Sequence, residues 1–113
     1  MKLRVLSLSL LLASCLAACG KPVPAEKAAY VGEWQRADMY LLITQDGSVR
    51  YKRLKGGATV SVDGPLKGFE GETFSVGIGP MTTSFHIDKA PHQDKDGAWR
   101  MSVDGAELTR TAQ

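Results

Sequence analysis

Apolar and polar residues alternate along most of this chain with a period of two. Met39, Leu41 and Ile43 occupy every second position, and the same alternation returns over residues 83–88 and 99–104. This spacing directs one face of a β-strand towards a core. Turn-forming residues separate the segments at intervals of roughly ten, and they are Asp46-Gly47, Asp63-Gly64-Pro65, Gly79-Pro80, Asp96-Gly97 and Asp104-Gly105. The pattern predicts an all-β domain with seven or eight short antiparallel strands.

The edges of such a small antiparallel meander must be paired or covered, because open strand edges pair with other chains. A barrel-like or strongly curved sheet meets this requirement. Ahead of the strands, residues 25–31 follow Pro24, and proline is well placed at the start of a helix. We therefore expect a short N-terminal helix and a single β domain over residues 30–113.

The N-terminus has the composition of a secretion signal. Lys2 and Arg4 precede the apolar run of residues 5–12, and small residues lead to Cys19. The run is too short for a membrane-spanning helix, which needs about 20 apolar residues. We predict a signal peptide over residues 1–18 and a lipidated cysteine with its tether over residues 19–29.

The residues Leu16-Ala17-Ala18-Cys19 resemble the lipobox of bacterial lipoproteins. The resemblance implies that the Cys19 sulfur carries diacylglycerol and that the signal is removed just before it. In Gram-negative lipoproteins an aspartate after the cysteine favours retention in the inner membrane, whereas Gly20 follows here. The resemblance therefore implies attachment to the periplasmic face of the outer membrane, where two or more acyl chains give a stable anchor.

Removal of the signal changes the charge and the cysteine count. It leaves 95 of the 113 residues and takes away Lys2 and Arg4, so the remaining chain has 12 basic and 12 acidic side chains. A balanced charge gives no support to nucleic-acid binding. With Cys15 removed and Cys19 lipidated, no thiol remains for a disulfide, a thiolate metal site or a cysteine nucleophile.

A second resemblance concerns the first predicted strand. Gly32-Glu33-Trp34 is similar to the G-x-W motif of lipocalins, in which an arginine near the end of the barrel packs over the tryptophan ring. Arg110 is the matching residue here. The chain has roughly half the length of a lipocalin, so the resemblance implies shorter strands and a smaller interior. It also raises a carrier of a small apolar ligand as an alternative function.

Local patterns for catalysis and metal binding are sparse. His86 lies on the polar face of its predicted strand, and an odd spacing from Met81 directs the two side chains to opposite faces. Asp94-Lys95-Asp96-Gly97 begins like a calcium loop, but position twelve is Gly105 instead of an acidic ligand. We predict no catalytic residue, no cofactor and no metal ion. An envelope hydrolase with an unusual loop site is kept as a third class.

Two surfaces are candidates for partner binding. Loops over residues 77–80 and 89–97 are expected on a rigid β scaffold, where recognition often lies, and the candidate partner surface is Pro91, His92, Gln93 and Asp94. The second surface is a basic cluster, formed by Arg50, Lys52, Arg53 and Lys55. We favour a structural role for this cluster, as charges that protect an edge strand from aggregation, over a role in binding acidic partners.

These observations favour a non-catalytic envelope lipoprotein that presents its loops to a periplasmic protein, such as an assembly factor or a target that it inhibits. The alternative is the carrier of a small apolar ligand. Volume separates the two functions, because a carrier needs an enclosed pocket of roughly 300 Å³ or more. A core filled by Trp34, Phe74, Phe85 and Trp99 leaves no such room.

Overall fold

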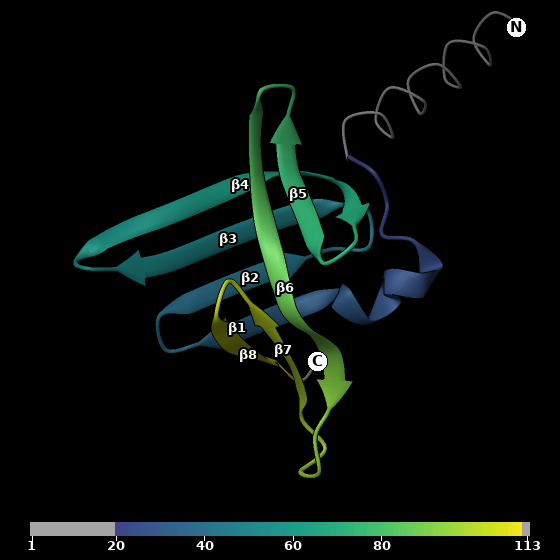
Figure 1. Ribbon diagram of the computed structural model, residues 1–113, viewed down its shortest axis with the longest axis vertical. Helices are drawn as coiled ribbons and strands as arrows, with labels where there is room; N and C mark the ends of the chain where they lie inside the picture. The colour runs from purple at the N-terminus through teal and green to yellow at the C-terminus, as the bar shows by residue number, and fades with distance from the viewer. Residues whose placement is uncertain (1–19, 112–113) are drawn as a thin grey trace, which may run out of the picture.

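The computed structural model describes residues 20–111 and shows a closed antiparallel β-barrel behind a short 3-10 helix. The helix is η1 (Ala25–Tyr30). The strands are β1 (Gly32–Arg36), β2 (Met39–Ile43), β3 (Ser48–Lys55), β4 (Ala58–Glu70), β5 (Thr73–Ile78), β6 (Met81–Gln93), β7 (Trp99–Val103) and β8 (Ala106–Arg110). Each strand pairs with its neighbour in sequence, as Figure 1 shows. The predicted all-β meander is confirmed, with eight strands.

A short seam between the first and last strands closes the barrel. In this seam Trp34 pairs with Arg110 and Gln35 pairs with Thr109. The Thr111 amide then donates to the Glu33 carbonyl at 2.8 Å and extends the ladder by one bond. Both outer strands therefore have partners, and the aggregation-prone edges of an open sheet are removed.

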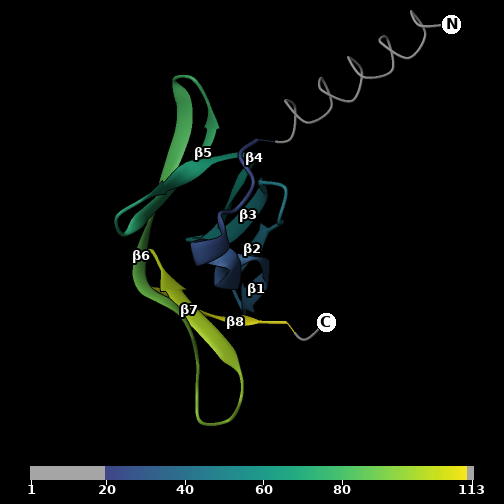
Figure 2. The ribbon, with the colours of Figure 1, turned by 90° about the vertical axis from the view of Figure 1, so that its right-hand side faces the viewer.

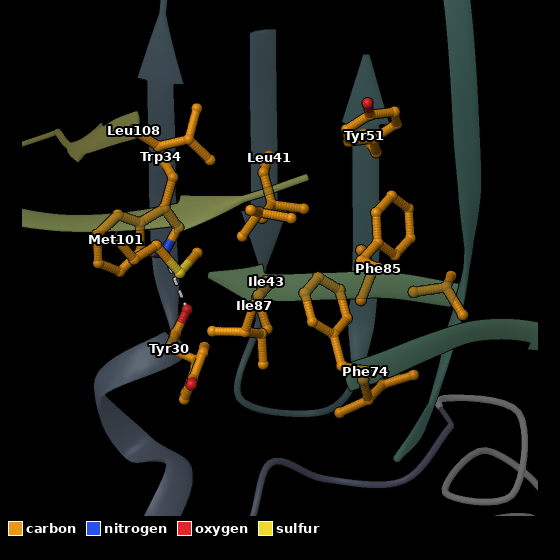
Figure 3. Packing of buried hydrophobic residues seen from close by; sticks show 14 of the residues in the cluster. Tyr30, Trp34, Leu41, Ile43, Tyr51, Phe74, Phe85, Ile87, Met101 and Leu108 are labelled. Atoms are coloured by element: carbon orange, nitrogen blue, oxygen red, sulfur yellow. Dashed lines mark hydrogen bonds between the residues drawn. The ribbon is translucent and has the colours of Figure 1, made fainter. Parts of the chain in front are cut away.

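The barrel interior is filled by the apolar members of the alternating strands. Trp34, Leu41, Ile43, Met101 and Leu108 are fully buried, as Figure 3 shows for the packing around them. The Phe74 and Phe85 rings stack with their centroids 4.9 Å apart, and the Tyr51 ring lies 4.9 Å from Phe85. Aromatic pairs at this spacing add to the stability gained by burial.

The segment before β1 packs against the barrel. Val23 and Tyr30 are buried, and the Val23 amide donates to the Gln45 carbonyl at 3.0 Å. The Gln45 side chain returns a hydrogen bond to the Val23 carbonyl at 2.9 Å. Residues 21–30, expected to belong mostly to the tether, therefore lie along the barrel wall.

The turn predicted at Asp63-Gly64-Pro65 is wrong, because β4 runs straight through it. These residues pair with β3, where Asp63 lies opposite Arg50 and Pro65 lies opposite Ser48. A Cβ at Gly64 would lie 3.4 Å from Val76 Cγ1 of β5, an ordinary contact, so this position of the strand does not require glycine. The hairpin turn lies instead at Gly56 and Gly57, both of which have the positive φ that favours glycine.

Three hairpins extend beyond the barrel. The β3–β4 hairpin projects to one side in Figure 1, while the β5–β6 and β6–β7 hairpins extend to opposite ends of the long axis. Figure 2 shows the same opposition after a quarter turn. Strand β6 joins both ends, so one element fixes their relative position. No helix among residues 20–111 has the length and apolar character needed to cross a membrane.

Candidate functional site

Gly32, Trp34 and Arg110 come together where the barrel closes. The Arg110 guanidinium carbon lies 5.6 Å from the centroid of the buried Trp34 ring, and the indole Nε1 donates to the Tyr30 carbonyl at 2.9 Å. A Cβ at Gly32 would lie 2.8 Å from Arg110 Cδ, and the φ of Gly32 is +145°. Glycine is therefore needed both for its backbone and for the space that the arginine occupies. These contacts hold the first strand against the last, so the three residues have a structural role in closing the barrel.

Arg110 also contacts a second tryptophan at the surface. Its guanidinium carbon lies 4.8 Å from the centroid of the Trp99 ring. Trp99 is half-buried, unlike the fully enclosed Trp34, Phe74 and Phe85 with which it was grouped as a core residue. A hollow of about 440 Å³ lies beside this pair and is lined by residues 31–32, 96–99 and 110–111. The barrel end thus presents an aromatic side chain and a cation to the outside.

The hairpin between β6 and β7 is held by a compact ion-pair network. Arg100 Nη2 lies 3.0 Å from Asp96 Oδ2, and Nη1 lies 3.2 Å from Asp96 Oδ1. The same Nη1 lies 2.5 Å from Asp94 Oδ2. Hydrogen bonding to Arg100 is the main cause that lowers the pKa of Asp96 below its ordinary value. A bidentate arginine gives geometric definition as well as attraction, so this tip is preorganised.

The candidate partner residues lie along this hairpin, but the prediction of a loop over residues 89–97 is wrong at its start. Strand β6 continues to Gln93, and the turn comprises residues 94–98. Pro91 is tolerated because the pairing with β7 shifts between Lys89 and His92. The pairing of β6 with β5 ends at His86, with one further bond from the Ile87 amide to the Glu72 carbonyl, so Pro91 lies beyond the reach of β5.

His92 and Gln93 contribute to the order of the hairpin. The His92 Nδ1 lies 2.9 Å from the Ala90 carbonyl oxygen, and Nε2 lies 3.2 Å from Asp94 Oδ1. The Gln93 side-chain amide donates to the Gly97 carbonyl at 3.0 Å. His92, Gln93 and Asp94 of the candidate partner surface are therefore held within the hairpin, whereas Pro91 lies in the irregular part of β6.

The basic cluster is divided between two faces of β3. Arg50 and Lys52 point outward, whereas Arg53 lies on the face of the buried Tyr51, where its Nη1 donates to the Asp104 carbonyl at 3.3 Å. Arg50 pairs with Asp63 at 3.2 Å. The four cations, Arg50, Lys52, Arg53 and Lys55, therefore do not form a continuous patch. The edge-strand explanation is also wrong, because β3 pairs with β2 on one side and β4 on the other.

The loop predicted over residues 77–80 is wrong at its start, because β5 continues to Ile78 and the turn to β6 comprises Gly79 and Pro80 alone. Ile78 and Met81 flank it as a directly opposed pair, with exposed fractions of 73% and 81%. A Cβ at Gly77 would lie 2.0 Å from the Met81 carbonyl oxygen, so only glycine allows the two strands to approach this closely. Sequence reasoning identified the turn but missed the exposed apolar pair, whose signal is the placement of isoleucine and methionine on either side of Gly79-Pro80.

Cys19 and His86 are the last two residues that the sequence singles out. Cys19 lies outside the described residues, and Gly20 is the first residue after it. His86 is exposed, with Nε2 3.6 Å from Asp88 Oδ1 and 3.9 Å from Glu72 Oε2. Over residues 20–111, no group of three or more histidine, cysteine, aspartate or glutamate side chains is arranged to hold a metal ion.

Sequence reasoning missed the Arg100 network entirely. Arg100 follows Asp96 by four residues and Asp94 by six, with a turn between them. In a strand region this spacing does not predict that the three side chains will meet. The strand beginning at Trp99 was predicted, but the shape of the turn that brings Asp94 and Asp96 to Arg100 was not. Comparison with protein-family models, with curated proteins and with solved structures found no match to this chain.

Proposed function

We propose that this protein is a non-catalytic lipoprotein of the cell envelope, anchored through Cys19 to the outer membrane, that binds a periplasmic protein through the end of its β6–β7 hairpin. The binding surface comprises the hairpin residues 91–98 together with Trp99 and Arg110. The partner class is a protein, such as an assembly factor or a target that the domain inhibits.

The observation that carries the proposal is the preorganised hairpin tip. Arg100 holds Asp94 and Asp96 together at 2.5 and 3.0 Å, so the turn projects from the barrel with a defined shape. Binding by a rigid surface avoids much of the entropy cost of ordering a loop. The exposed Lys95 at the tip and the half-buried Trp99 at the base supply a charge and an aromatic anchor within one surface.

Aromatic and arginine side chains are the residues that dominate many protein interfaces. Trp99 and Arg110 lie 4.8 Å apart beside the 440 Å³ hollow, where a partner side chain can be received. The basic cluster on β3 offers a weaker case, because Arg50 is already paired with Asp63 and its members lie on two faces. These differences favour the hairpin.

The test is photo-crosslinking in living cells from single positions. A photoreactive amino acid replaces Lys95 at the hairpin tip in one strain and Lys52 of the basic cluster in another. Both positions are exposed, so the two probes have similar access. We expect an adduct of one defined size from position 95. Co-expression of the unlabelled wild-type protein should compete it away.

The matched control is an unlabelled competitor carrying His92→Ala and Lys95→Glu, which should compete poorly. An adduct from position 52 alone would show that the partner binds at β3 and not at the hairpin. Equal competition by the wild type and this variant would show that the adduct does not depend on the hairpin and would contradict the proposed surface.

A carrier of a small apolar ligand is the second candidate, favoured by the closed eight-stranded barrel with Trp34 and Arg110 at its seam. The contacts among Tyr51, Phe74 and Phe85 oppose it, because these rings occupy the barrel interior. Organic extraction of protein purified without detergent, followed by mass spectrometry, distinguishes the two. A stoichiometric apolar compound would favour the carrier.

A further inference from the structure

The tip of the β5–β6 hairpin exposes two large apolar side chains. Ile78 and Met81 face each other across the turn on the same face as Phe74 and Val76, which are buried further along the hairpin. The apolar stripe therefore continues from the core into solvent. Contiguous exposed apolar side chains often mark a surface that contacts a membrane or another molecule.

One side-chain hydrogen bond and a close backbone approach fix the shape of the β5–β6 tip. The Thr82 hydroxyl donates to the Gly79 carbonyl at 2.8 Å, and the close approach at Gly77 fixes the spacing of the two strands. Ile78 and Met81 consequently cannot fold back together onto the barrel without breaking the hairpin ladder. Their exposure is built into the local fold.

The chain enters the described structure close to this tip. Gly20 packs against Pro65 and Leu66 of β4, and the Lys21 amide donates to the Leu66 carbonyl at 3.2 Å. Leu66 in turn pairs with Val76, two residues before Ile78. Strand spacing and rise place the tip about 10–15 Å from this entry point. Figures 1 and 2 show the β5–β6 tip at the upper end of the long axis and the chain entering in the same half of the molecule, beside β4.

Lysines accompany the apolar tip. Lys67 is exposed and its Nζ lies 3.4 Å from the Thr82 hydroxyl, next to Met81, while Lys21 is exposed beside the chain entry. A second hollow lies beside these lysines, where Lys27 is positioned over the Phe69 ring and Glu26 and Glu70 add negative charge at the border. The positive charge closest to the tip comes from Lys21 and Lys67. Apolar tips flanked by lysine suit the boundary between anionic headgroups and acyl chains.

We propose that the β5–β6 tip inserts Ile78 and Met81 into the surface of an anionic lipid bilayer, next to the anchored N-terminus. The occupant is a membrane because Cys19 precedes Gly20 directly, so the proposed lipid anchor would hold this tip at the bilayer surface. The inference rests on that anchor for its orientation. It assigns the other end, with the β6–β7 hairpin, to the periplasmic space.

The experiment measures oxidation of Met81 in the full-length protein, purified from bacterial membranes and reconstituted into vesicles of phosphatidylethanolamine and phosphatidylglycerol. Leu54→Met supplies an internal control, because Leu54 is 56% exposed on the laterally projecting β3–β4 hairpin. Leucine and methionine have similar volumes, so the change is mild. Dilute hydrogen peroxide is added, and sulfoxide at each methionine is followed by mass spectrometry.

We expect Met81 to oxidise at least about tenfold more slowly than the control methionine, because the bilayer shields its thioether from the aqueous oxidant. Lys21→Glu with Lys67→Glu should reduce this protection while the protein still sediments with the vesicles. Equal oxidation of both methionines on sedimenting vesicles would overturn the tip proposal and leave the anchor intact. Failure to sediment would overturn both.

Discussion

At the scale of single residues, the contact between Trp34 and Arg110 determines how firmly the barrel closes. Trp34 is fully buried and is paired directly with Arg110 in the closing seam. We predict that Trp34→Ala lowers the free energy of unfolding by about 3–5 kcal/mol, since it removes a large buried ring. Arg110→Ala should cost about 0.5–2 kcal/mol through the lost cation–π contact. Urea unfolding measures both.

Arg110→Lys serves as the control for charge. Lysine keeps the positive charge but cannot present a planar guanidinium to the Trp34 and Trp99 rings. Stability near that of Arg110→Ala would support stacking as the main contribution, whereas full recovery by lysine would contradict it.

Asp96 gives a residue-level prediction for pH. Hydrogen bonding to Arg100 lowers the pKa of Asp96 in the folded hairpin, so its contribution to stability is present above the unfolded-state pKa. That contribution is lost as the pH falls through the lower, folded-state pKa. Carboxyl NMR titration should show Asp96 protonating below its ordinary range, and Arg100→Gln should raise its pKa. Lys95→Gln, at a neighbouring exposed position, should leave the titration almost unchanged.

Individual site residues differed in how far the sequence could predict them. The contact of Trp34 with Arg110 was expected from the resemblance to the G-x-W motif, and the structure explains it by pairing these two residues in the closing seam. The division of Arg50 and Arg53 between two faces follows from their odd spacing in a strand. The Arg100 network was not predictable, because its distances depend on where β6 ends and on the shape of the turn.

At the scale of elements, Gly77 controls the β5–β6 hairpin. Alanine there would place Cβ 2.0 Å from the Met81 carbonyl oxygen, whereas alanine at Gly79 meets open space. Both glycines have positive φ, but Gly79 is at +56°, where alanine costs about 1–2 kcal/mol, and Gly77 is at +132°, which is less accessible to alanine. We predict that Gly77→Ala costs at least about 1 kcal/mol more, from the clash together with this backbone conformation. Thermal unfolding compares them, and equal stabilities would contradict the close approach.

Element boundaries show where sequence reasoning reached its limit. Alternation located the strands, and four of the five predicted turns are correct, at Asp46-Gly47, Gly79-Pro80, Asp96-Gly97 and Asp104-Gly105. Asp63-Gly64-Pro65 did not form a turn, because β3 and β5 supply partners on both sides of β4 at that point. Pro91 likewise lies within β6 since an irregular pairing accommodates it. Such tertiary contacts override local turn preferences and cannot be seen in one segment.

At the scale of the whole molecule, the two hairpins extended by β6 give the domain two distinct ends. The chain enters near the β5–β6 tip, and the β6–β7 hairpin lies at the other end of the long axis (Figures 1 and 2). A domain tethered at one end can present the other to partners in the periplasm. This arrangement links the proposed anchor, the membrane contact and the binding surface.

The anchor predicts a change in location when its sulfur is removed. Cys19→Ser should prevent acylation, and the protein should lose its stable membrane association, because no acyl chain remains to hold it. Lipid labelling and fractionation of cells measure the change. Ser14, inside the predicted signal, offers a control, since Ser14→Ala leaves Cys19 in place and should remain labelled. Persistent labelling of Cys19→Ser would contradict the assignment.

The most direct measurement of the central claim is the intact mass and N-terminal sequence of the protein isolated from bacterial membranes. We predict a chain that begins at Cys19 and carries diacylglycerol on the cysteine sulfur. The β-barrel would then be held at the outer membrane next to its β5–β6 tip. A mature chain that begins at another residue, or one with an unmodified Cys19, would contradict the anchored orientation on which the proposed function and the membrane contact depend.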